Sequence, residues 1–130
     1  VYGGETSNGL LSDQLYALDL QTLTWSLVDI MFAGAQGPFG RQQHVSIYQP
    51  ANDALFVYGG EQYHSGSYSW ASGVVWRLRL GVQPLQWELF VQLTTSPAGV
   101  NGGAVHDPTR NEMVLYGGNI PGTSAGSSVI

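Results

Sequence analysis

The residues best suited to contact another molecule lie in one short segment, residues 61–73, with the sequence EQYHSGSYSWASG. Tyrosine and tryptophan provide large contact area at a low cost in side-chain entropy, while serine and glycine adapt to the shape of a partner. Loops carried by a rigid scaffold are the usual location of such residues. We therefore predict that this segment is a loop that binds a protein partner through four side chains, Tyr63, His64, Tyr68 and Trp70.

Arg41 is the charged residue that we expect to anchor the same partner. A guanidinium can bind a carboxylate through two parallel hydrogen bonds. The alternative is a structural arginine that donates to the backbone carbonyls of its own sheet. Two glutamates, Glu5 and Glu61, directly follow Gly-Gly pairs at matching positions. That repetition indicates a structural role at the turn.

Residue types that support catalysis or metal binding are present but not suitably spaced. His44, His64 and His106 come from separate segments without the close spacing of metal-binding histidines. The chain contains no cysteine, which excludes disulfides and cysteine-ligated metals within it. The glycine-rich residues 99–103 lack the lysine and following helix of a phosphate-binding loop. The sequence therefore predicts no catalytic residue, metal or cofactor, and favours a binding protein over an enzyme.

The charge balance restricts the kind of partner. The net charge is −5, with nine acidic residues, four arginines and no lysine. Binding to phosphate backbones or anionic membranes requires clustered basic residues, so we expect neither nucleic acid nor membrane as a partner. No apolar run approaches the length of a membrane span. The absence of an Asn-x-Ser/Thr sequon favours an intracellular, cytoplasmic setting.

A repeated sequence indicates the elements that position these residues. The run LFVYGG at residues 55–60 recurs as VYGG at 1–4 and as VLYGG at 114–118. The first glycines of these pairs, Gly3, Gly59 and Gly117, lie 56 and then 58 residues apart. β-Branched and aromatic residues favour a strand, and a glycine pair ends it with a turn in which no Cβ fits. A fixed period of this length predicts stacked supersecondary units.

The segments around the glycine pairs also repeat. LYALDL is followed by Trp25, and VVWRLRL is followed by Trp87. PFGRQQHVSIY at residues 38–48 matches PAGVNGGAVHD at 97–107. This order resembles the Kelch repeat, with a departure at Val100 and Gly103, which replace the arginine and histidine of the family pattern. The resemblance implies an all-β fold of four-stranded antiparallel β-propeller blades, with both tryptophans packed between blades and Arg41 at the mouth of a central channel.

The period divides the chain into parts of three blades. We predict the end of one blade at residues 1–37, a full blade at 38–96 and the start of a third at 97–130. The strands of the full blade are expected at residues 43–48, 54–58, 74–80 and from Trp87 onward, and a connection is expected at 29–39. Propellers close with about four to eight blades, so we expect an incomplete propeller that belongs to a longer chain or a larger complex.

The resemblance implies a protein-interaction module that presents the loops of one blade face to a partner. Two alternatives are a sugar-acting Kelch-like enzyme of the epimerase or oxidase type and an architectural subunit of a large assembly. The copper-oxidase version requires a cysteine linked to a tyrosine, which this chain lacks. A convergent set of arginine, glutamate and histidine side chains would favour the epimerase version.

Overall fold

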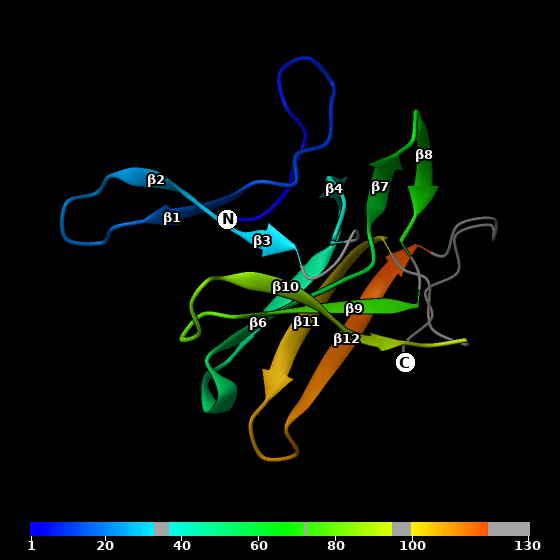
Figure 1. The fold of residues 1–130 in the computed structure, drawn as a ribbon. Helices are drawn as coiled ribbons and strands as arrows, with labels where there is room; N and C mark the ends of the chain where they lie inside the picture. The colour runs from blue at the N-terminus through cyan, green and yellow to red at the C-terminus, as the bar shows by residue number, and fades with distance from the viewer. Residues whose placement is uncertain (33–36, 72, 95–99, 120–130) are drawn as a thin grey trace.

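The computed structural model describes residues 1–32, 37–71, 73–94 and 100–119 (Figure 1). The fold of this part is all-β, as predicted, with small sheets that are mostly antiparallel and not closed into a barrel. Its only helical element is a 3-10 turn, η1 (Pro50–Asn52). None of the described residues belongs to a helix of membrane-spanning length and hydrophobicity.

The central sheet contains the four strands predicted for the full blade. Strands β5 (Val45–Gln49), β6 (Ala54–Tyr58), β9 (Val74–Arg79) and β10 (Gln86–Gln92) pair in that order as an antiparallel meander. The bounds of β6 are those predicted from LFVYGG, because its apolar run is buried on both faces and the glycine pair ends it. We call these four strands the middle unit.

Two hairpins lie on opposite faces of the middle unit. Strands β1 (Leu15–Leu18) and β2 (Trp25–Val28) form the first, with Tyr2 joined to β1 by an isolated bridge. Strands β11 (Val100–Asp107) and β12 (Glu112–Asn119) form the other. The hairpins pack against alternate residues of β6, whose side chains point to opposite faces of the sheet. We call residues 1–32 the first unit and residues 100–119 the third unit.

Two segments differ from the sequence prediction. Within the expected connection at 29–39, β3 (Met31–Phe32) pairs in parallel with the edge strand β10. The expected loop at 61–73 contains a hairpin of β7 (Glu61–His64) and β8 (Ser67–Trp70), which joins β4 (Arg41–Gln42) in a three-stranded sheet. Figure 1 shows this hairpin projecting from one end of the central sheet.

The Gly-Gly pairs have the conformation predicted for them. Both glycines of each pair have positive φ, for example +71° at Gly59 and +87° at Gly60. A Cβ on Gly60 would lie 2.5 Å from the carbonyl oxygen of Gln42, and one on Gly3 would lie 2.6 Å from that of Arg41. Gly3 and Gly60 are therefore required by the left-handed backbone and by the close approach of β4. The prediction is wrong in two respects: an added Cβ on Gly4 or Gly117 would meet no atom within 4 Å, and the third pair lies inside β12 and does not end it.

Candidate partner-binding site

The turn of the β7–β8 hairpin consists of a serine and a glycine. These residue types favour a loop in the sequence, and here they connect two paired strands. Ser65 and Gly66 have φ of +51° and +84° between the two strands. Two successive residues with positive φ are typical of the type I′ turn, whose twist matches that of paired strands. The turn places Tyr63 opposite Tyr68 and Glu61 opposite Trp70.

Three of the predicted aromatic residues share one face of this hairpin. Tyr63 and Tyr68 are cross-strand neighbours with ring centroids 5.0 Å apart, and Trp70 follows Tyr68 by two residues. Tyr68 and Trp70 are about half exposed. The Tyr68 hydroxyl also donates a hydrogen bond of 2.9 Å to the Gly9 carbonyl of the first unit, which fixes the hairpin against a neighbouring loop.

His64 has a different environment from these three residues. Its ring stacks on Phe39 with a centroid separation of 3.9 Å and an interplanar angle of 27°. The imidazole therefore covers a neighbouring aromatic ring, and its other ring face is the part that a partner can contact.

Arg41 lies beneath the hairpin on β4 and is almost fully buried, with 1% of its surface exposed. Its Nε donates to the Phe39 carbonyl at 3.1 Å, its Nη1 donates to the Gly59 carbonyl at 3.1 Å, and its Nη2 lies 3.5 Å from Oε1 of Gln62. Within the described part of the chain, no carboxylate forms an ion pair with it. Burial lowers the pKa of Arg41, yet a guanidinium stays protonated at neutral pH.

Arg41 and Trp70 meet at a cavity of roughly 170 Å³. Trp76 on β9 and Gln92 on β10 contribute to its wall with Gln62, and the complete lining is Phe39, Arg41, Gln62, Trp70, Ala71, Val74, Trp76, Leu89 and Gln92. Tyr63, His64 and Tyr68 do not line it. Since a water molecule occupies about 30 Å³, this volume suits one side chain of a partner better than a whole small ligand.

The cavity has one kind of charge and no titratable acid in its wall. Its polar side chains are a guanidinium, two amides and two indoles, each with an N–H donor, and the remaining wall is aromatic and aliphatic. A buried cation whose hydrogen-bond acceptors are all neutral binds an anion favourably, because the anion compensates for the hydration that the cation lost on burial. The arrangement is therefore suited to a carboxylate with an apolar neighbour.

The sequence analysis missed the amide residues of this wall. On β7, Gln62 lies on the face opposite that of Tyr63, because successive side chains of a strand point to opposite faces. Gln92 lies at the end of β10. Both glutamines reach the cavity only because the three-stranded sheet packs beside the central sheet. No short sequence pattern indicates how these two sheets are arranged. Trp76 lies on the strand expected at residues 74–80, and nothing in the sequence indicates that it lines a cavity.

A buried tyrosine, Tyr2, and a half-buried histidine, His44, lie near Arg41 and do not line the cavity. The Tyr2 hydroxyl donates to the carbonyls of Pro38 and Phe39, and its ring packs edge-on against His44 with centroids 5.6 Å apart. Burial raises the pKa of Tyr2 above its usual range. Burial and the Arg41 charge lower the pKa of His44 to about 4, so this imidazole is neutral at pH 7. Both residues stabilise the site rather than titrate within it.

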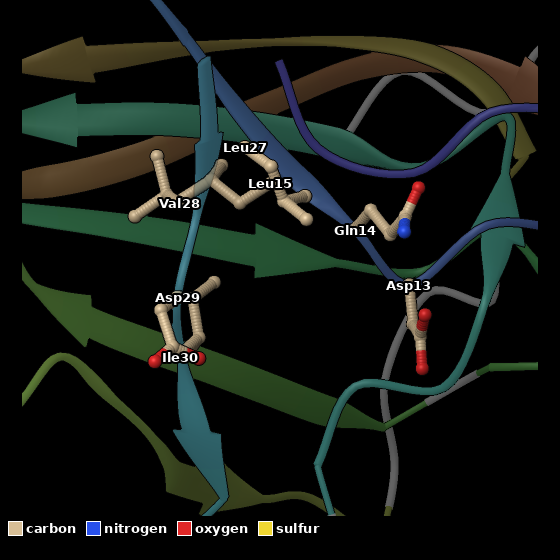
Figure 2. A pocket seen from close by; sticks show the side chains of 7 residues that line it. All are labelled: Asp13, Gln14, Leu15, Leu27, Val28, Asp29 and Ile30. Carbon is tan, nitrogen blue, oxygen red and sulfur yellow. The ribbon is translucent and has the colours of Figure 1, made fainter.

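A larger cavity of roughly 290 Å³ lies beside the β1–β2 hairpin (Figure 2). Figure 2 shows Asp13 and Gln14 on one side of it, Asp29 and Ile30 on the other, and Leu15, Leu27 and Val28 along the top of the view. No candidate residue from the sequence analysis lines it. Among the described residues, no group of three or more histidine, cysteine or acidic side chains is arranged to hold a metal ion.

The sequence matches no family model and no curated protein. We therefore infer the function from the geometry of the site.

Proposed function

We propose that this chain is part of a Kelch-type β-propeller that recognises a protein partner. The partner contacts the face that carries the β7–β8 hairpin, with Tyr63, His64, Tyr68 and Trp70 supplying contact area and Arg41 serving as the polar anchor.

The propeller part of the proposal is supported by repeated strand registers. Leu18 on β1 lies opposite Trp25 on β2, and Leu78 on β9 lies opposite Trp87 on β10. The repeated tryptophan therefore occupies the same position in two units. Four-stranded antiparallel units that stack through their faces are the construction principle of propellers.

The recognition part rests on one observation, the meeting of Arg41 and Trp70 at a single cavity below an exposed aromatic face. A hydrogen bond to a charged group contributes about 1.5–3 kcal/mol. Burial of a large apolar side chain adds about 1.5–3 kcal/mol. Together these contributions are sufficient for one strong anchor within a protein interface.

The experiment is a selection of peptides from a random displayed library on the immobilised protein. We expect enrichment of peptides that combine an acidic residue with an apolar one. Trp70→Ala should weaken binding of the selected peptides at least tenfold. The matched control is Tyr48→Ala, because Tyr48 is an exposed aromatic residue at the opposite end of the central sheet.

Two results would contradict the proposal. One is a selection that enriches no peptide above background. The other is a selected peptide that loses affinity equally in Trp70→Ala and Tyr48→Ala, because the partner would then not use the proposed face.

A further inference from the structure

The interface between the first and middle units buries one particular face of the middle unit. Val57, Trp76 and Trp87 on that face form a cluster with Tyr2 and Leu15 of the first unit. We call this face of the middle unit, and the equivalent face of any other unit, face A.

The interface between the middle and third units buries the opposite face. Phe56, Tyr58 and Val75 of the middle unit pack against Met113 and Leu115 of the third unit. We call this face of the middle unit, and its equivalents, face B.

The first unit presents its own face B to the middle unit. Tyr2 and Tyr58 both directly precede a Gly-Gly pair. Tyr2 is bridged to Leu15 as Tyr58 is paired with Val75. The residues that the first unit buries are therefore the equivalents of face B.

The third unit presents its own face A. Leu115 precedes the tyrosine of its Tyr-Gly-Gly sequence, as Val57 precedes Tyr58 in the middle unit. Both interfaces in the chain are thus the same contact, face B of one unit on face A of the next.

Face A of the first unit is left uncovered by the described residues. Its Trp25 is equivalent to Trp87, since each lies opposite a matching leucine in the register of its hairpin. Trp25 is 56% exposed, whereas Trp87 is 0% exposed. Tyr16, equivalent to Trp76, is also exposed.

Face B of the third unit is uncovered in the same way. Tyr116 is 58% exposed, whereas its equivalent Tyr58 is 4% exposed. Val105 is 51% exposed, whereas Ile47, its equivalent by hairpin register, is 8% exposed.

We propose that these two surfaces bind each other between copies of this chain, with face B of the third unit of one copy on face A of the first unit of a second copy. The contact continues an interface that the chain already forms twice. Because the two surfaces differ, the association is head-to-tail and produces a ring or an open series of copies. This proposal does not depend on the partner-binding site, which lies on other residues.

The test uses one blocking substitution on each surface. Trp25→Asp blocks face A of the first unit, and Val105→Asp blocks face B of the third unit. Both side chains are exposed within a single chain, so each variant should fold, which circular dichroism and thermal unfolding can verify. Val82→Asp is the control, because Val82 is an exposed apolar residue in the turn between β9 and β10.

Sedimentation velocity over a range of concentrations gives the result. We expect wild type and Val82→Asp to associate, and each blocking variant alone to associate at least tenfold more weakly. An equimolar mixture of the two blocking variants should form a dimer that grows no further, because only one competent pair of surfaces remains.

Three results would overturn the proposal. The first is a wild-type protein that remains monomeric at all concentrations tested. The second is a blocking variant that self-associates as wild type does, which would mean that like surfaces pair. The third is a native protein in which additional repeat units of the same polypeptide cover both faces.

Discussion

Replacing Gly60 with alanine tests whether the glycine pairs are required by close backbone approach. Gly60 has a φ of +87°, where a residue with a Cβ is strained by about 1–2 kcal/mol. The added Cβ would also lie 2.5 Å from the Gln42 carbonyl oxygen and 2.9 Å from the backbone nitrogen of His44. Relief of such overpacking costs about 1–3 kcal/mol. We therefore expect Gly60→Ala to lower the free energy of unfolding by about 2–5 kcal/mol.

Gly66→Ala is the matched control for this substitution. Gly66 has a φ of +84° but no atom within 4 Å of the position of an added Cβ. Only the backbone strain of about 1–2 kcal/mol applies there. Urea unfolding followed by the fluorescence of the buried tryptophans measures both variants. If Gly60→Ala is no more destabilising than Gly66→Ala, the close approach of β4 is not what requires the glycine.

Three further predictions concern the packing and charges of the middle unit. Trp87→Ala should cost about 3–5 kcal/mol of unfolding free energy because its side chain is completely buried, whereas Trp25→Ala should cost less than about 1 kcal/mol in dilute protein; equal losses in chemical denaturation would refute this difference. The fold keeps the His44 imidazole neutral by lowering its pKa from 6.5 to about 4. Because the unfolded chain then binds a proton more readily than the folded chain, the free energy of unfolding should fall by roughly 2 kcal/mol as the pH drops from 6.5 to 4. An NMR titration that gives His44 an ordinary pKa would contradict this prediction. Arg77 and Arg79 on β9 lower the pKa of Glu88, so these ion pairs should add about 1 kcal/mol to the free energy of unfolding at neutral pH. This contribution should be lost as the pH falls below 4.5 and should be absent in Glu88→Gln. Identical profiles of stability against pH for wild type and variant would show that the ion pairs contribute nothing.

The strands of the middle unit could be predicted from the sequence because their signals are local. The apolar run before Gly59 is long enough for a buried strand, and the glycine pair marks its end. A tryptophan opposite a leucine of the preceding strand also recurs in the first unit, where Trp25 lies opposite Leu18. The prediction that both repeated tryptophans pack between units is confirmed for Trp87, which lies in a cluster with Tyr2 of the first unit, and is wrong for Trp25, which is 56% exposed.

The pairing of the β7–β8 hairpin could not be predicted in the same way. Ser65 and Gly66 are common in loops, and only their backbone conformation identifies a hairpin turn. The pairing of β7 with β4 joins segments about 20 residues apart along the chain. The parallel contact of β3 with β10 joins segments that are farther apart still.

The sequence indicates two residues of the cavity wall but not the cavity that they share. Arg41 and Trp70 are both expected from their chemistry to contact a partner, and the structure brings them to one cavity. The backbone-bonded arginine that the sequence analysis weighed as an alternative is also present, since Arg41 donates to two carbonyls. The two interpretations are compatible, because a guanidinium that donates to carbonyls keeps further N–H donors that a ligand could accept from.

A heteronuclear NMR titration of the protein with a selected acidic peptide shows directly whether the face of the β7–β8 hairpin binds the partner. We expect the Nε resonance of Arg41 and the indole resonance of Trp70 to shift on binding, together with the backbone resonances of β7 and β8. Shifts confined to the opposite end of the central sheet, around Tyr48, would contradict the claim that this face recognises the partner.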